Sequence, residues 1–272
     1  MDFSVTTDQA GMNEDVAVLF PAFATAGFKF VHWCQHWAGT PVFYDKAFAE
    51  RTLALAREWG LAVADIHGYS GPDEGTTYTD ELFLAANINR AEFAQRVGAD
   101  VLVVHLPLRG RRDYRNAAPA DMAAAVEHAS AMLDALRKPC MACGVRVALE
   151  NLGPPADREE FFDPLLARFG EDYLGFCYDS GHALIYGRPG LIERYCEKGR
   201  RLIATHLHDN DGTADQHRPP GEGKVDWPMI IRAMRRCGYA KAPNLELIKP
   251  KELPLLPYCQ RGFQLISKLF AD

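Results

Sequence analysis

Residues 98–106 have the sequence GADVLVVHL, a glycine followed by an apolar run that ends in histidine. The run is rich in valine and apolar at consecutive positions, as expected for a strand of a parallel sheet that is covered on both faces. The preceding residues, 78–97, have the pattern of an amphipathic helix. Because glycine tolerates the left-handed conformation that closes a helix, the stretch predicts a unit of helix, glycine cap and strand.

The same unit recurs along the whole chain. A glycine precedes an apolar run at seven places, namely Gly27, Gly60, Gly98, Gly144, Gly170, Gly199 and Gly238. Residues 3–7 supply a further strand, so that eight strands are predicted. Helices are expected between them, at about 14–26, 44–59, 78–97, 119–142, 157–168, 188–198, 226–237 and 256–270. This alternation predicts an α/β protein, a single-domain (β/α)8 TIM barrel over residues 1–272.

The alternative, an open doubly wound sheet, would show about six strands and often a glycine-rich phosphate turn. Neither a GxGxxG nor a GxxxxGK[ST] motif is present in the sequence.

Composition limits the classes of partner. The net charge is −6 and no long basic run is present, so nucleic acid is an unfavoured partner. No apolar run approaches the roughly 20 residues that a membrane span needs, and the N-terminus lacks the pattern of a signal peptide. The seven cysteines are expected to be reduced thiols, and we expect a cytoplasmic protein without a membrane partner.

Histidines and carboxylates gather at the predicted strand ends. Carboxylates end three of the apolar runs, at Glu150, Asp179 and Glu246. Histidines lie where a run gives way to a loop at His32, His67, His105, His182, His206, His208 and His217. A single strand-end histidine is more often structural, and Asp179 alone could cap the next helix. All C-terminal strand ends of a TIM barrel meet at one mouth, however, and this number of polar residues there predicts a metal site.

Glu150, Asp179, His206 and Glu246 are the predicted ligands of one divalent metal. Such mixed oxygen and nitrogen ligation suits Mn²⁺, Mg²⁺, Co²⁺ or Zn²⁺. His208 lies two residues after His206 and faces the same side of the strand, so it is expected to contact the substrate or support the ligands. A metal that binds neighbouring oxygens of a sugar would acidify the C–H beside the carbonyl. Glu150 and Glu246 could then move protons on opposite faces of an enediolate.

Other candidates for substrate contact are less specific. Trp33 and Trp37 follow the second strand, where they could stack on a sugar or pack in the core. Arg218 could bind a substrate phosphate or hydroxyl, or be solvated surface. Residues 208–226 form a long loop rich in glycine and proline after the seventh strand, which we interpret as an active-site lid.

Five motifs carry a resemblance to a known family: VALENLG at 147–153, YDSGHA at 178–183, HLHDNDG at 206–212, PGEGKVDW at 220–227 and LEL around Glu246. With them, the chain resembles the xylose isomerase-like TIM barrel superfamily, and its tagatose 3-epimerase-like members in particular. The resemblance implies that Glu150, Asp179, His206 or His208, and Glu246 bind one divalent metal, with the two glutamates as acid and base. It also implies that His182 contacts a small sugar substrate, and that the chain could form homo-oligomers.

The superfamily also includes family 2 AP endonucleases, which hold three zinc ions. Their additional ligand positions match His67, His105, His182, Asp215 and His217. YDSGHA departs from the DTCHA-like segment of that branch, the lid is shorter, and the acidic charge does not favour DNA. The expected function is therefore a metal-dependent isomerase or epimerase of a sugar, sugar phosphate or related polyol. The alternatives are a trinuclear zinc phosphodiesterase, a dehydratase of the same superfamily, and a non-catalytic sugar-binding barrel.

Overall fold

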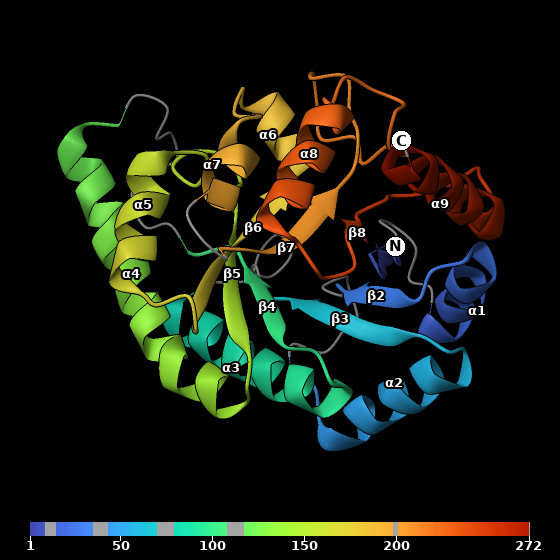
Figure 1. Ribbon diagram of the computed structural model, residues 1–272. Helices are drawn as coiled ribbons and strands as arrows, with labels where there is room; N and C mark the ends of the chain where they lie inside the picture. The colour runs from blue at the N-terminus through green and yellow to red at the C-terminus, as the bar shows by residue number, and fades with distance from the viewer. Residues whose placement is uncertain (9–14, 35–42, 70–78, 108–116, 198–200, 272) are drawn as a thin grey trace.

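The computed structural model describes residues 1–8, 15–34, 43–69, 79–107, 117–197 and 201–271. Eight parallel strands pair in chain order, and the last pairs with the first to close a barrel (Figure 1). The predicted (β/α)8 barrel is confirmed. The strands are β1 Ser4–Thr6, β2 Phe30–Trp33, β3 Ala62–His67, β4 Val101–Val104, β5 Arg146–Glu150, β6 Leu174–Asp179, β7 Leu202–Leu207 and β8 Asn244–Leu245.

Helices surround the strands. The described residues form one helix more than the eight predicted, because α6 precedes α7 after β6. None of these helices is long and apolar enough to cross a membrane. They are α1 Val16–Ala26, α2 Lys46–Glu58, α3 Asp80–Val97, α4 Pro119–Ala142, α5 Glu159–Arg168, α6 Ser180–Ile185, α7 Leu191–Glu197, α8 Trp227–Cys237 and α9 Leu255–Ala271.

Glycine closes several of the helices as predicted. Gly27 and Gly98 end α1 and α3 with φ values of 112° and 86°, a conformation that other residues adopt at a cost. The prediction was wrong for Gly170, which is not left-handed, because α5 ends at Phe169 in an extended conformation. Gly199 lies outside the described residues.

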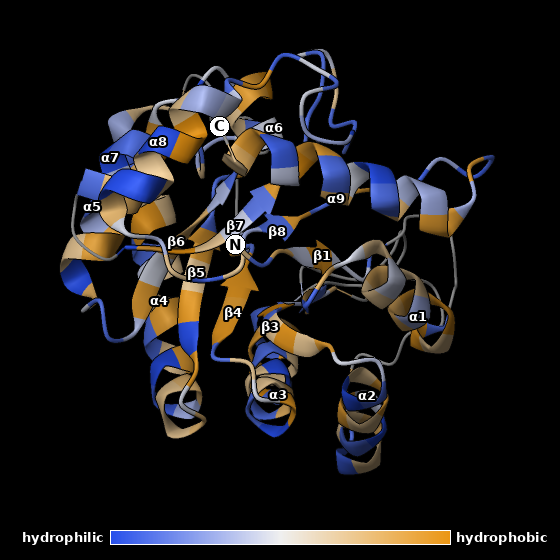
Figure 2. Ribbon diagram, turned by 45° about the vertical axis from the view of Figure 1, so that its right-hand side comes forward, coloured by the Kyte–Doolittle hydropathy of each residue, from blue (hydrophilic) through white to orange (hydrophobic). Residues whose placement is uncertain are grey.

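The strands are covered on both faces, which sets where polar side chains can lie. All four residues of β4 are buried, and Figure 2 shows this strand in hydrophobic colour, whereas α2 and α3 carry both colours. A small apolar cluster of β4–β7 is separate from the main core and contains Val103, Ala148, Cys177 and Ala204. Since side chains alternate along a strand, the positions two residues after these face the same interior. Those positions include Glu150, Asp179 and His206.

Candidate metal centre

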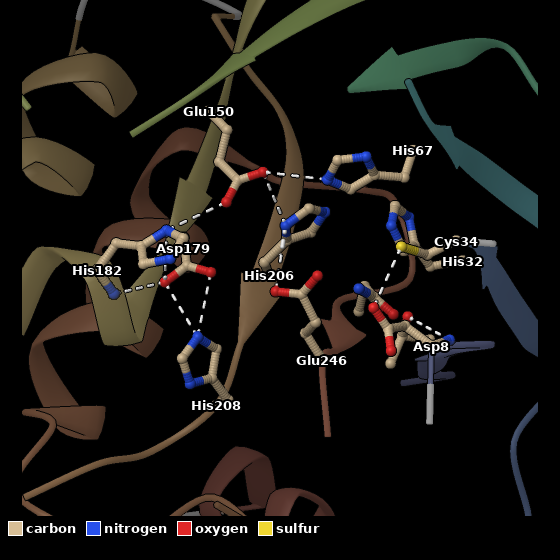
Figure 3. Close-up of polar contacts among 12 residues, drawn as sticks. Asp8, His32, Cys34, His67, Glu150, Asp179, His182, His206, His208 and Glu246 are labelled. Carbon is tan, nitrogen blue, oxygen red and sulfur yellow. Dashed lines mark hydrogen bonds and ion pairs between the residues drawn. The ribbon is translucent and has the colours of Figure 1, made fainter. Parts of the chain in front are cut away.

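Four side chains meet at the C-terminal ends of the last four strands. Glu150 ends β5, Asp179 ends β6, His206 lies near the end of β7, and Glu246 follows β8. Asp179 and His206 are direct partners in the parallel register. Ligand atoms of all four residues lie within 4.8 Å of one another, and all four residues are buried. The structure therefore brings together the four predicted ligands, as Figure 3 shows.

Glu150 lies at the centre of the group. Its Oε2 is 2.9 Å from His105 Nε2 and 3.0 Å from His206 Nδ1, and its Oε1 is 3.2 Å from His182 Nδ1. Burial raises the pKa of this carboxyl, but the charges of His206 and His105 outweigh burial and hold the pKa well below its ordinary value. Glu150 is therefore a carboxylate at neutral pH.

Glu246 has the opposite electrostatic environment. Its Oε2 lies 3.4 Å from His206 Nδ1, and burial raises the pKa of its carboxyl to about 8 despite His206 and His217. The neighbouring Glu150 carboxylate contributes to that rise. In the protein without a metal, Glu246 therefore carries a proton at neutral pH.

The chemistry of the four residues fits a divalent cation. Three carboxyl groups share one buried volume, where a bound divalent cation would favour the ionised form of all three, Glu246 included. Neither ring nitrogen of His206 has a hydrogen-bond partner of good geometry among the described residues, although the ring is fully buried. Three carboxylates and one imidazole are a ligand set that suits Mn²⁺, Mg²⁺, Co²⁺ or Zn²⁺.

Residues 178–183, YDSGHA, position Asp179 and His208. Asp179 is the N-cap of α6 and accepts a hydrogen bond from the His182 backbone N–H at 2.6 Å. Its two carboxylate oxygens also lie 3.1 Å from His208 Nε2. The Ser180 hydroxyl donates to the His208 carbonyl at 2.7 Å and accepts from the His208 N–H. Asp179 thus combines the two roles that its sequence position allows, as a helix cap and as a member of the ligand group.

A second polar group, made of His182, Asp215 and His217, lies beside the four predicted ligands. Asp215 Oδ2 lies 3.2 Å from His182 Nε2 and 3.0 Å from His217 Nε2. The His217 ring stacks on His208 with ring centroids 4.0 Å apart. Burial lowers the pKa of His217, but its hydrogen bond to Asp215 and the nearby Glu246 raise it to about 9. His182 and Asp215 therefore connect the second group to Glu150.

A third group extends from Glu150 towards β3 and β4. Ligand atoms of His67, His105 and Glu150 also lie within 4.8 Å of one another. The His67 Nδ1–H donates to the Gly68 carbonyl at 2.8 Å, which leaves Nε2 directed at Glu150 Oε2, 3.9 Å away. All the histidines and acids predicted to be additional ligands thus lie around Glu150 and Asp179. Their roles remain predictions.

The loop of residues 208–226 is held at its base. The buried carboxylate of Asp209 accepts hydrogen bonds from Gly221 N, Val225 N and Trp227 Nε1, at 2.9, 3.1 and 2.8 Å. The backbone of Arg218 pairs with that of Asp209, and its guanidinium lies 3.2 Å from Asp211. The motif residues Asp209 and Gly221 therefore hold the two ends of the loop together. A substrate contact by Arg218 remains a prediction.

The predicted substrate contact of Trp33 is wrong. Its side chain is fully buried, its indole N–H donates to the Tyr44 hydroxyl at 3.2 Å, and its ring packs against Phe48 and Phe93. Phe48 belongs to α2 and Phe93 to α3, so Trp33 faces the helices and not the barrel interior. Trp37 lies outside the described residues.

A buried pair of polar side chains beside the metal group is not predicted by the sequence pattern. His32 Nδ1 lies 2.7 Å from Asp65 Oδ1, and both side chains are buried. The signal for this pair was a charged or polar residue inside an apolar strand, in FVHW and again in ADIH. Asp8 is a second acid that the sequence pattern does not predict as part of a site. Its carboxylate accepts a hydrogen bond from the Cys34 thiol at 3.7 Å. Burial raises the pKa of Asp8 to about 7.

Comparison with known proteins agrees with this architecture. Residues 20–267 match the family model described as xylose isomerase-like TIM barrel. The uncharacterised protein y4fM of Sinorhizobium fredii is 28% identical over 255 residues, which cover 81% of this chain and 77% of that relative.

Two solved structures resemble the whole chain in fold. A D-tagatose 3-epimerase-like protein has a TM-score of 0.77 and 15% identity, with 100% of this chain and 97% of that chain covered. The IOLI protein with a binding zinc atom has a TM-score of 0.72 and 15% identity, with coverage of 100% and 98%.

Proposed function

The chain belongs to the xylose isomerase-like TIM barrel family, and on that premise we propose that it is a divalent-metal-dependent isomerase or epimerase. Its substrate would be a sugar, a sugar phosphate or a related polyol. The observation that carries the proposal is the buried group of Glu150, Asp179, His206 and Glu246, whose ligand atoms lie within 4.8 Å of one another. Similarity in fold to a tagatose 3-epimerase-like protein supports it.

Glu150, Asp179, His206 and Glu246 would hold the metal. When bound, a divalent cation supplies a Lewis acid that polarises a carbonyl and acidifies the neighbouring C–H. The zinc in the similarly folded IOLI protein supports a metal in this family.

The two glutamates are placed for proton transfer, because both carboxyl groups belong to the buried ligand group. Glu150 is ionised and can accept a proton from the carbon beside a carbonyl, which leaves an enediolate on the substrate. Glu246, which follows β8 and belongs to the same group, would return a proton to the opposite face.

His182 and His208 would bind and orient the substrate. Both lie against Asp179, at 3.5 and 3.1 Å, and Nδ1 of the fully buried His208 has no hydrogen-bond partner among the described residues. Substrate hydroxyl groups are suitable partners for such imidazole nitrogens.

Solvent exchange tests this function even while the identity of the sugar is unknown. Incubation of ketoses, sugar phosphates and inososes with the enzyme in D₂O should give one deuterium at the carbon beside the carbonyl. We expect Glu150→Gln and Glu246→Gln to lower the exchange rate by about 10²–10⁴-fold, the usual contribution of general acid–base catalysis. Glu58→Gln, at the exposed end of α2, is the control and should exchange normally. Full exchange in both site variants would refute the proton-transfer roles, and loss of water from the substrate would indicate a dehydratase.

One observation favours a second candidate, a metal-dependent phosphodiesterase that acts on abasic DNA. The groups around His67 and His105 and around Asp215 and His217 extend from the same Glu150 and Asp179, so that more than one ion could bind. Nicking of an abasic-site duplex by the zinc-loaded protein, abolished by a chelator, would support this candidate. Absence of nicking with two or three zinc ions bound would remove it.

A further inference from the structure

His32 and Asp65 form a buried polar pair in the barrel interior. They are partners in the register of β2 and β3, and a shift of this register falls between Val31 and His32. The Asp65 side chain is only 4% exposed and that of His32 is not exposed at all. A polar pair that replaces apolar side chains in a core seldom adds stability, which favours a functional reason for its presence.

The pair defines which nitrogen of His32 is available. A carboxylate can only accept, so the His32 Nδ1–H donates to Asp65, and Nε2 carries the lone pair. That Nε2 is buried and has no hydrogen-bond partner among the described residues. The His32 ring lies 4.6 Å from the His206 ring, and one nitrogen of each lies within 4.8 Å of a Glu246 oxygen.

The His206 ring would supply the N–H donor that matches the lone pair on His32 Nε2. Its Nδ1 faces Glu150 and Glu246, at 3.0 and 3.4 Å, which makes Nδ1 the nitrogen directed at the metal group. If Nδ1 binds a metal through its lone pair, Nε2 must carry the ring proton. Nε2 of His206 is also buried without a hydrogen-bond partner of good geometry in the described part of the chain. Two neighbouring rings therefore each carry a buried Nε2 without a hydrogen-bond partner of good geometry, and Figure 3 shows the two rings side by side.

We infer that His32, oriented by Asp65, is a positioning residue that accepts the Nε2–H of His206 and so fixes His206 as a metal ligand. The inference rests on the proposed metal site. Metal-binding histidines generally donate their second N–H to an acceptor, most often a carboxylate, a backbone carbonyl or water, and loss of that acceptor typically weakens metal affinity by about 10–100-fold. Here the His32 imidazole would take that place.

The thiol of Cys177 is the rival partner for His206. Ligand atoms of Cys177 and His206 lie within 4.8 Å of each other. Burial lowers the pKa of His206, but the interaction with this thiol contributes to raising it well above its ordinary value. Sulfur is a weak acceptor, whereas the imidazole of His32 is a strong one whose basicity Asp65 increases.

Titration of the metal-free protein with Mn²⁺ or Co²⁺ by calorimetry tests the inference. His32→Leu removes the acceptor and should weaken affinity by about 10–100-fold. His32→Gln places an amide oxygen near the position of Nε2 and should recover most of that loss. Asp65→Asn keeps the shape of the side chain but allows the other His32 tautomer. Its metal affinity should lie between those of His32→Leu and His32→Gln. Cys177→Ala is the control and should bind with wild-type affinity.

The Co²⁺ absorption spectrum at saturating metal supplies a readout that a merely structural role would not change. We expect the ligand-field bands to shift in His32→Leu and to return in His32→Gln. If wild type binds metal tightly and both His32→Leu and Asp65→Asn bind it equally well with unchanged spectra, the inference is wrong while the proposed site stands. Weakening in Cys177→Ala alone would assign the role to Cys177 and also overturn it. If wild type itself binds no metal, the proposed function fails first.

Discussion

Gly181 shows how closely single residues are fitted around the candidate site. A Cβ at this position would lie 1.9 Å from His208 Cε1, and the His208 ring cannot move away freely because it stacks on His217. We expect Gly181→Ala to lower the free energy of unfolding by about 1–3 kcal/mol, the usual cost of overpacking, and to displace His208 from Asp179. Urea unfolding measures the first effect and metal titration the second.

Gly190→Ala is the matched control for this substitution. Nothing lies within 4 Å of a Cβ at Gly190, and the residue is not left-handed. Its stability should match wild type or exceed it slightly, because alanine reduces the freedom of the unfolded chain. Equal unfolding midpoints for the two variants would contradict the tight packing that we infer at Gly181.

The pKa of Glu246 makes a prediction about pH in the metal-free protein. Folding raises this pKa from 4.5 to about 8, so the folded state holds the proton more tightly than the unfolded chain. The contribution of Glu246 to the free energy of unfolding therefore falls as pH rises through this range. Gln cannot ionise, so we expect the stability of Glu246→Gln relative to wild type to increase between about pH 5 and about pH 8. Urea unfolding with a chelator present checks this, and a constant or decreasing difference would contradict it.

Among the elements, the 208–226 loop is tied together at its two ends by the buried carboxylate of Asp209. Asp209 accepts three N–H groups from the far end of the loop and from α8, and it is fully buried. In Asp209→Asn an amide N–H₂ would face these donors, so we expect a loss of about 3 kcal/mol in the free energy of unfolding. Hydrogen exchange of the Gly221 and Val225 amides should increase in the same variant.

Asp226→Asn is the control within the same loop. Asp226 is the N-cap of α8 and accepts from the Met229 N–H at 3.0 Å. Asparagine is about as good an N-cap as aspartate, so the free energy of unfolding should change by less than about 0.5 kcal/mol. A loss in this variant as large as that in Asp209→Asn would mean that any charge removed from the loop has this effect.

The order of the elements was predictable because helix and strand periods alternate so regularly along this chain. The four-residue group followed, since Glu150, Asp179, His206 and Glu246 end parallel strands that must meet at one mouth. The His32–Asp65 contact was not predictable, because it depends on a register shift between neighbouring strands that leaves no mark on the hydropathy pattern. The side that Trp33 faces could have been inferred, since it follows His32, one of the histidines expected at the barrel mouth, and neighbouring side chains of a strand face opposite sides.

At the scale of the whole molecule, the barrel brings ligands from four consecutive strands to one point. The central claim is that this point binds a metal through Glu150, Asp179, His206 and Glu246. Elemental analysis of protein purified without chelator or nickel tests it most directly, with Asp179→Asn and His67→Ala measured beside wild type. We predict one divalent metal per chain in wild type and in His67→Ala, and almost none in Asp179→Asn. Wild-type protein without metal, or Asp179→Asn with the full amount, would contradict the account.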